Sequence, residues 1–325
     1  MTSRVSGGWL LASNERTERS GVTLTPTGMA LFDIYSEDFE AAKQIHNNNS
    51  VIDMTKLIID TDIGTDVDDT LALAYAIKSG MDIPLITTVH GNTISRARIA
   101  RKVTRLLGVD IPIVAGAEKP LVHPYVFWTG LEGKDFLGVD DSEPIRTNAV
   151  EALAECILQH QNNISIAAIA PMTNLGKLFQ QFPDLASYVN HIYIMGNAIL
   201  CDKTYHLNYR AHNLKIDPHA ADIVFGTSIP KTIVTTEVCK QLSLSKDDLE
   251  RLNKTGEPLF QYIHNSALRW MNFINYDVTY LYDPLVVHHV IDDAVTTKVS
   301  YGPIQITVNV NPEFKNTLMQ TLLKK

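Results

Sequence analysis

Five aspartates lie within ten residues of one another near position 60, and they are the first feature of the sequence that could do chemistry. They follow an apolar run and are Asp60, Asp62, Asp66, Asp68 and Asp69. Carboxylates this close repel one another, and a bound cation removes that cost. Hard cations such as Ca²⁺ and Mg²⁺ bind oxygen ligands, and Ca²⁺ accepts bidentate carboxylates. The stretch therefore predicts a metal site at which a neighbouring aspartate acts as a base toward water.

The segments around the aspartates determine how these side chains are placed. The apolar residues 57–59 predict a buried strand, and residues 70–77, rich in Ala and Leu, predict a helix. In open α/β sheets, ligands bind where a strand ends and a helix begins. Helix capping is an alternative role for Asp68 and Asp69, because carboxylates stabilise a helix N-terminus. Capping leaves the aspartates on the strand side unexplained.

Two other motifs compete for this stretch. An EF-hand loop beginning at Asp60 would need a glutamate at its twelfth position, where this chain has Leu71, so that interpretation fails. A haloacid-dehalogenase-like phosphotransferase also carries an Asp-x-Asp pair at a strand end, where it holds Mg²⁺ and a phosphoryl group. Such enzymes usually continue with x-Thr or x-Val, whereas this chain continues with Ile63 and Gly64. This hypothesis stays open and predicts Mg²⁺-dependent activity on phosphorylated substrates.

Apolar runs and amphipathic segments alternate along the rest of the chain. Further strands are predicted at residues 83–92, 111–116, 164–170 and 191–197, and helices at 96–107, 148–159 and 257–275. This alternation predicts an α/β fold in which helices flank a mostly parallel central sheet. Residues 119–146 predict a long loop whose aromatics, Tyr125, Phe127 and Trp128, either cover a flat base in a pocket or anchor the loop itself.

The overall composition excludes several classes of function. The 325 residues are 45% apolar and 20% charged, which is typical of one large globular domain. The net charge of −8 argues against a nucleic-acid partner, because phosphate binding needs a basic surface. Three widely spaced cysteines form neither a disulfide framework nor a zinc site, which favours a cytoplasmic location. Because no apolar run approaches membrane-spanning length, we expect no membrane partner.

The stretch from Asp60 to Leu73 resembles the N-terminal signature of the inosine–uridine-preferring nucleoside hydrolases. Later stretches resemble further segments of that family in the same order, and they begin at Pro171, His191, Arg210 and Leu281. The resemblance covers roughly residues 56–295. It implies a Rossmann-like α/β fold, a homodimer or homotetramer, and Ca²⁺-dependent hydrolysis of the N-glycosidic bond of ribonucleosides in purine and pyrimidine salvage.

The resemblance also implies roles for individual residues. The implied Ca²⁺ ligands are Asp62, Asp69, Asp283 and the backbone carbonyl of Ile169. The implied ribose-binding residues are Asp68, Asn92, Met195 and Asn213. Asp62 takes a proton from the water that attacks the anomeric carbon. Tyr282 stands where the family carries a histidine that assists departure of the base, so Tyr282 is the candidate acid.

Two departures from the family pattern keep a second hypothesis open. Ala211 stands where the family carries a glutamate that binds the ribose 5′-hydroxyl, and Tyr282 replaces the histidine. A hydrolase or binding protein of the same fold for another ribose-like ligand is therefore the alternative. Residues 1–53 lie outside the resemblance and predict an N-terminal extension, whereas residues 54–325 predict a single catalytic domain.

Overall fold

A nine-stranded sheet forms the centre of the structure, a computed structural model that describes residues 55–122 and 125–324. The predicted N-terminal extension, residues 1–53, lies outside the described residues. Neighbouring strands are parallel except for the antiparallel edge pair β12 and β13. In sheet order the strands are β12 (Thr296–Tyr301), β13 (Ile304–Val310), β9 (Lys231–Thr235), β6 (His191–Gly196), β5 (Ile164–Ala168), β1 (Lys56–Thr61), β2 (Leu85–Thr88), β3 (Ile113–Ala115) and β4 (Arg146–Thr147).

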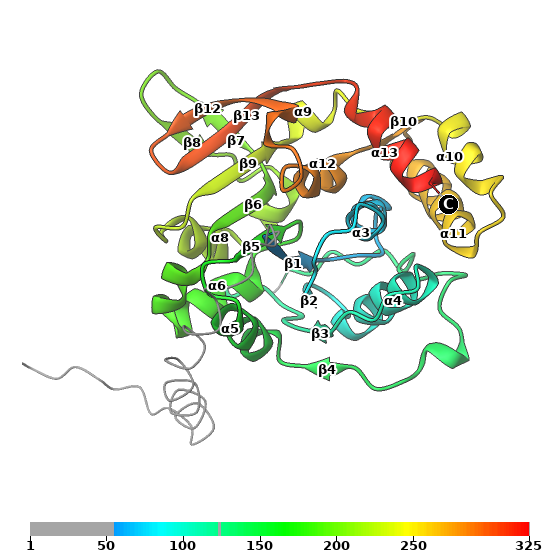
Figure 1. Cartoon of the computed structure of the whole chain (residues 1–325), viewed down its shortest axis with the longest axis horizontal. Helices are drawn as coiled ribbons and strands as arrows, with labels where there is room; N and C mark the ends of the chain where they lie inside the picture. The colour runs from blue at the N-terminus through cyan, green and yellow to red at the C-terminus, as the bar shows by residue number, and fades with distance from the viewer. Residues whose placement is uncertain (1–54, 123–124, 325) are drawn as a thin grey trace, which may run out of the picture. The chain divides into compact units, whose positions relative to one another are not determined.

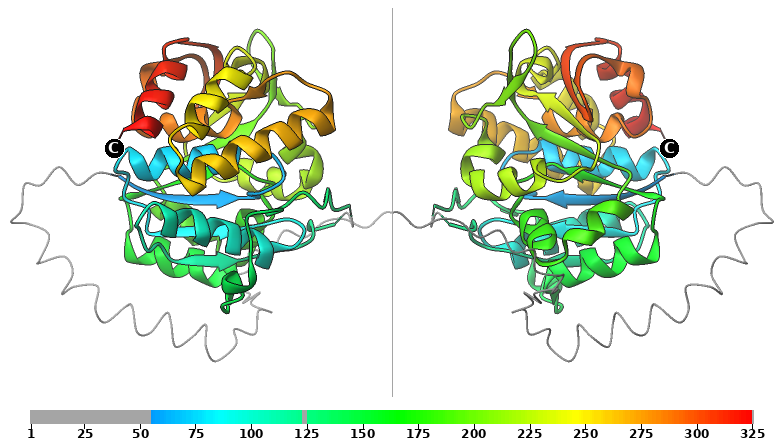
Figure 2. Two further views of the ribbon diagram at one scale, coloured as in Figure 1. Left: turned by 90° about the vertical axis from the view of Figure 1, so that its right-hand side faces the viewer. Right: turned by 90° about the vertical axis from the view of Figure 1, so that its left-hand side faces the viewer.

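Helices cover both faces of this sheet (Figures 1 and 2). One face carries α3 (Asp68–Lys78), α4 (Thr93–Leu106), α9 (Thr236–Cys239), α10 (Lys246–Asn253), α11 (Pro258–Ile274), α12 (Tyr282–His288) and α13 (Phe314–Leu323). The other face carries α5 (Ala149–Gln159), α6 (Thr173–Gln181), α7 (His212–Ile216) and α8 (Pro218–Phe225). The predicted α/β fold with a mostly parallel central sheet is confirmed.

Strand β1 shows why the chain builds a sheet with two covered faces. Leu57, Ile58 and Ile59 are all 0% exposed. Successive side chains of a strand point to opposite faces, so Leu57 and Ile59 join the core beneath α3 and α12, while Ile58 joins the core beneath α5 and α6. A continuous apolar run is typical of a strand buried on both sides.

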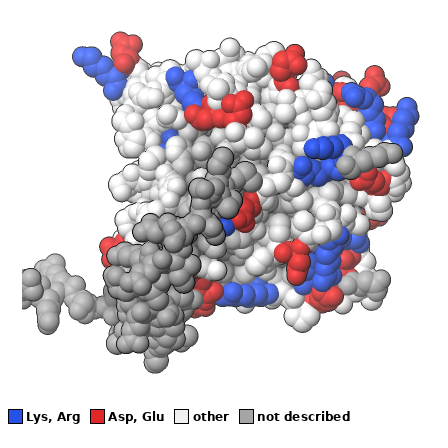
Figure 3. Space-filling view, viewed as in Figure 1, with Lys and Arg blue, Asp and Glu red and all other residues white. Residues whose placement is uncertain are grey.

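Two short antiparallel pairs lie outside the main sheet. They are β7 (Ala198–Leu200) with β8 (Tyr205–Leu207), and β10 (Ser243–Leu244) with β11 (Thr279–Tyr280). Among the described residues, no helix is long and apolar enough to cross a membrane. On the face seen in Figure 3, acidic and basic side chains of the described residues are interspersed.

Candidate active site

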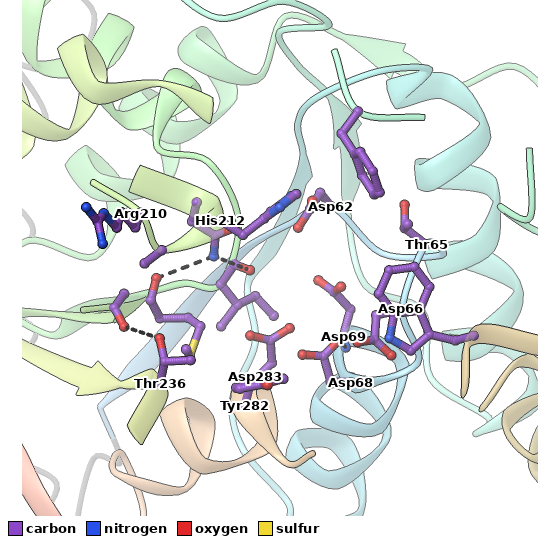
Figure 4. Close-up of a pocket in the computed structure, with 17 residues that line it drawn as sticks. Asp62, Thr65, Asp66, Asp68, Asp69, Arg210, His212, Thr236, Tyr282 and Asp283 are labelled. Carbon is purple, nitrogen blue, oxygen red and sulfur yellow. Dashed lines mark hydrogen bonds between the residues drawn. The ribbon is translucent and has the colours of Figure 1, made fainter. Parts of the chain in front are cut away.

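A pocket of about 320 Å³ opens where four parallel strands end. Asp62 follows β1, Ile169 follows β5, Met195 lies at the end of β6 and Thr236 follows β9, and all four residues line the pocket. The carboxyl ends of parallel strands meet at one edge of a sheet, where α/β proteins bind their ligands. Figure 4 shows that side chains converge there from the loop after β1 and from α3, α7, α9 and α12.

Three buried carboxylates meet at the base of this pocket. Asp68 and Asp69 lie in the first turn of α3, and Asp283 lies in the first turn of α12. One oxygen from each lies within 4.8 Å of the other two, and the three residues are at most 6% exposed (Figure 4). Helices α3 and α12 pack against each other, which brings residues more than 200 positions apart in the sequence to one point.

The electrostatics of these three carboxylates favour a cation. Burial, and then the neighbouring carboxylates, raise the pKa of Asp68, Asp69 and Asp283 well above the usual range. The hydroxyl of Thr61 donates a hydrogen bond to Asp69, which favours the ionised form of that carboxylate. Buried oxygen ligands at this separation are the donor set that Ca²⁺ and Mg²⁺ prefer, so these residues fit a hard divalent cation.

The loop between β1 and α3 turns at Gly64. The φ angle of Gly64 is +115°, which side chains with a Cβ rarely adopt, and a Cβ there would lie 2.5 Å from Cδ1 of Ile99. The turn places Asp62 and Asp66 in the pocket, but Asp62 is not part of the three-carboxylate group found among the described residues. Figure 4 shows Asp62 nearer to His212 than to Asp283.

The predicted residues from the neighbouring strands come together. Nδ2 of Asn213 donates to the backbone carbonyl of Ile169 at 3.2 Å and to that of Met195 at 3.4 Å. Asn213 and Met195 are each 8% exposed and line the pocket. The Ile169 carbonyl, the predicted Ca²⁺ ligand, therefore already accepts one hydrogen bond from the predicted ribose-binding asparagine.

The structure does not bring Asn92 into the pocket. Its side chain is exposed and its Oδ1 accepts a hydrogen bond from the backbone N–H of Ser95 at 3.0 Å. Asn92 is the N-cap of α4, and a capping side chain folds back over the first helical turn. The structure therefore does not bring Asn92 together with the other predicted ribose-binding residues, and its role in binding ribose stays a prediction.

Tyr282 does line the pocket, but its acidity is low. Burial, and then the charges of Asp68 and Asp66, raise the pKa of the Tyr282 hydroxyl far above its usual value. A phenol in this environment keeps its proton at neutral pH, so it can donate a hydrogen bond but is a poor source of a proton.

Residues 57–323 match the family described as inosine-uridine preferring nucleoside hydrolase. The chain belongs to this family. The match runs past the predicted limit at residue 295 and so includes β13 and α13. Because the family is defined by N-glycosyl hydrolysis, the protein is a hydrolase that acts on N-glycosyl compounds.

Individual relatives support this assignment. The non-specific ribonucleoside hydrolase RihC of Salmonella paratyphi B is 31% identical over 229 residues, which cover 66% of this chain and 73% of the relative. The purine-preferring ribonucleoside hydrolase from Gardnerella vaginalis has the same fold, with a TM-score of 0.71, 22% identity, and coverage of 82% of this chain and 97% of that one. The type III effector XopQ, solved with adenosine diphosphate ribose, also shares the fold, with a TM-score of 0.70, 19% identity, and coverage of 92% and 98%.

One buried residue beside the site, Arg96, was not predicted from the sequence. Arg96 of α4 is 0% exposed and donates to the backbone carbonyls of His90 at 2.6 Å, of Ile63 at 3.0 Å and of Asp62, and to the Thr65 hydroxyl at 3.1 Å. It therefore holds the loop that carries Asp62. The spacing of Arg96 in the helix could have indicated its burial, because Arg96 lies on the same helical face as the buried Ala100 and Val103 and not on the basic face.

Proposed function

We propose that this protein catalyses Ca²⁺-dependent hydrolysis of the N-glycosidic bond of ribonucleosides, which releases ribose and free base for purine and pyrimidine salvage. The observation that carries the proposal is the group formed by Asp68, Asp69 and Asp283 at the base of a pocket, in a chain of this family. A cavity of about 320 Å³ is within the usual range for small-molecule sites.

Asp69 and Asp283 would hold the cation, together with Asp62 and the Ile169 carbonyl. Bound there, Ca²⁺ would supply positive charge that lowers the pKa of a water molecule and stabilises developing negative charge. Asp68 lies within the same group and would share this role or bind a ribose hydroxyl. Because both Ca²⁺ and Mg²⁺ prefer oxygen ligands, the two are distinguished by which of them restores the activity of a chelated sample.

Asp62 is the proposed general base. It is half-buried, it lines the pocket, and its backbone is fixed by Arg96, so its carboxylate is positioned and still accessible to water. It would accept the proton of the water that attacks the anomeric carbon. The ribose ring gains positive charge as the base departs, and the surrounding carboxylates stabilise that charge.

The ribose would be held by Asp68, Met195 and Asn213. Carboxylates accept hydrogen bonds from ribose hydroxyls, and the side chains of Met195 and Asn213 line the facing wall. Tyr282 would donate a hydrogen bond to the departing base without transferring its proton, because its raised pKa keeps the phenol neutral. These contacts orient the bond that breaks, which is a major part of the rate enhancement.

Hydrolysis of inosine, uridine, adenosine and cytidine tests the proposal. We expect free ribose with Ca²⁺, no ribose after chelation, and loss of activity in Asp62→Asn. Asp110→Asn, in an exposed loop away from the pocket, is the matched control and should retain activity. A chelated sample restored by Mg²⁺ and not by Ca²⁺ would overturn the choice of metal, and no release from any nucleoside would overturn the reaction.

A second candidate is a hydrolase or binding protein for another ribose-like ligand. Ala211 lines the pocket with only a methyl group, where a nucleoside hydrolase would present a carboxylate. The fold is compatible with this candidate, because XopQ adopts it and was solved with adenosine diphosphate ribose. Ca²⁺ binding without turnover of any nucleoside in the same panel would favour this candidate.

We further propose a cytoplasmic enzyme that works as a homodimer or homotetramer. Cys156, Cys201 and Cys239 are free cysteines, and two of them are buried, which suits a reducing compartment. Light scattering after size-exclusion chromatography would measure the mass, and a monomer at micromolar concentration would contradict the assembly.

A further inference from the structure

The pocket is charged oppositely on its two sides. All five carboxylates that line it come from residues 62–69 and from Asp283. Arg210 and His212 line the wall formed where the chain enters α7, and Ala211 between them contributes a methyl group. Figure 4 shows Arg210 on one side of the buried carboxylates and Asp66 on the other. No carboxylate among the lining residues belongs to the wall that carries Arg210.

Arg210 differs from the other arginines of the described chain. Each of the other seven donates a hydrogen bond or forms an ion pair with a carbonyl, hydroxyl or carboxylate oxygen. The side chain of Arg210 has no such partner within residues 55–122 and 125–324. The residue is exposed and lines the pocket, and in Figure 4 its guanidinium lies at the outer side, directed away from the carboxylates. Its backbone is fixed, since Oδ1 of Asn208 accepts from the N–H of Arg210 at 3.2 Å. Asp222 on the following helix accepts a hydrogen bond from Tyr209.

The stereochemistry of ribose determines which of its substituents would lie against the wall that carries Arg210. With the 2′- and 3′-hydroxyls against the buried carboxylates, the base at C1′ and the substituent at C4′ share one face of the ring and extend from opposite ends of it. Asn213, the proposed ribose contact, follows directly on the segment that carries Arg210 and His212. Of the two orientations of the ring, the one with the 5′ end against this wall brings that end to a cationic side chain and leaves the base toward the opposite side of the pocket.

We infer that the pocket accepts ribosides with a phosphate on the 5′ oxygen, and that Arg210 binds this phosphate. The inference rests on the proposed function. A guanidinium presents a planar set of donors that matches phosphate oxygens, and an unpaired one needs no existing contact to be broken. In the reaction, the hydroxyl of water bonds to C1′, the C1′–N bond breaks with its electron pair leaving on the base, and the base takes up a proton. The products are ribose 5-phosphate and free base.

Initial-rate kinetics of the full-length chain test the inference, with Ca²⁺ present and no phosphate in the buffer. The substrates are inosine and uridine, their 5′-monophosphates and their 3′-monophosphates. We expect kcat/KM to be higher for the 5′-monophosphates than for the nucleosides, and lower for the 3′-monophosphates, whose phosphate would face carboxylates. Mass spectrometry should detect ribose 5-phosphate as the product, which excludes prior removal of the phosphate.

Arg210→Gln and Lys215→Gln form the matched pair of variants. Lys215 is an exposed cation on α7 that does not line the pocket. Arg210→Gln should lower the ratio of kcat/KM for 5′-monophosphate over nucleoside by roughly tenfold or more, the loss typical of one charge-assisted hydrogen bond. Lys215→Gln should leave this ratio unchanged. As a binding measurement, calorimetry should show tighter binding of ribose 5-phosphate than of ribose in the unmodified chain and a smaller difference in Arg210→Gln.

Three outcomes would overturn the inference. Turnover of nucleosides without preferred turnover of 5′-monophosphates would remove it and leave the proposed function standing. An equal fall of the kcat/KM ratio in Arg210→Gln and Lys215→Gln would show that the general positive charge near the pocket, and not a contact with Arg210, favours the phosphate. Release of base from neither class of substrate would overturn the proposed function and, with it, this inference.

Discussion

Replacing Asp60 by asparagine should remove about 2.5 kcal/mol of the pH dependence of stability. Asp60 lies one residue before the end of β1 and is 0% exposed. Its Oδ1 accepts from Thr87 at 2.6 Å and from Asn174 at 2.8 Å, whereas Oδ2 is buried and has no partner among the described residues. Burial raises the pKa of Asp60 from 3.8 to about 7, and Asp62 adds to this effect.

The sign and size of the effect follow from linkage. The folded protein binds the Asp60 proton more tightly than the unfolded chain does, so stability is lost as pH rises from about 4 to about 7. With 3.8 for the unfolded chain and about 7 for the folded protein, the loss between pH 5 and pH 8 is about 2.5 kcal/mol. Asp60→Asn cannot ionise and should lack this contribution.

Urea denaturation at pH 5 and pH 8 measures the effect in chelated samples. The difference in unfolding free energy between the two pH values should be smaller in Asp60→Asn than in the unmodified protein by about 2.5 kcal/mol. The exposed Asp110→Asn is the control and should behave as the unmodified protein does. An equal pH dependence in Asp60→Asn and the unmodified protein would refute the reasoning, because the burial of Asp60 would then carry no proton linkage.

Three further predictions concern the cation, the helix cap and the buried arginine. Asp283→Asn should weaken Ca²⁺ binding and lower kcat/KM by roughly 100-fold or more, and calorimetry showing unchanged Ca²⁺ affinity would contradict it. Asn92→Ala should lower the unfolding free energy by about 1 kcal/mol, because the helix cap is lost, and should change kcat/KM by no more than a factor of about two. A large loss of kcat/KM would instead show that Asn92 acts in the site. Arg96→Met should lower kcat by roughly 100-fold, because the loop that carries Asp62 would be misplaced. Arg96→Lys should not restore kcat, because an ammonium lacks the guanidinium geometry needed for four acceptors. Full kcat in Arg96→Met would show that the loop keeps its conformation without Arg96.

The fold was predictable because local pattern and tertiary environment agree. The unbroken apolar run in β1 indicates a strand covered on both faces, and the helices of the described chain do cover both faces. Helix α11 was predicted at residues 257–275 and spans Pro258–Ile274. Helix ends were less predictable, since α3 begins at Asp68, two residues before the predicted start, where the carboxylates of the site occupy the first turn.

The site was predictable only where residue type and position along a motif determine the chemistry. Asp68, Asp69 and Asp283 were expected to be near one another, and they are. An asparagine after a strand suits both a ligand contact and a helix cap, and in the structure the side chain of Asn92 makes the capping hydrogen bond with Ser95 and does not line the pocket. Arg96 carries no motif at all, since its role depends on four acceptors that come from loops distant in sequence.

The same carboxylates that fit a cation also reduce the stability of the chain without one. Asp68, Asp69 and Asp283 have raised pKa values because burial and mutual repulsion disfavour their ionised forms, and a divalent cation reverses both effects at once. Two sets of contacts hold the three carboxylates together against this repulsion. Helix α3 packs on α12, and Arg96 donates hydrogen bonds to the β1–α3 loop. The fold compensates the repulsion between the carboxylates before a cation binds. The coordinating oxygen atoms therefore need little rearrangement when the cation binds, which is the condition for a preorganised electrostatic site.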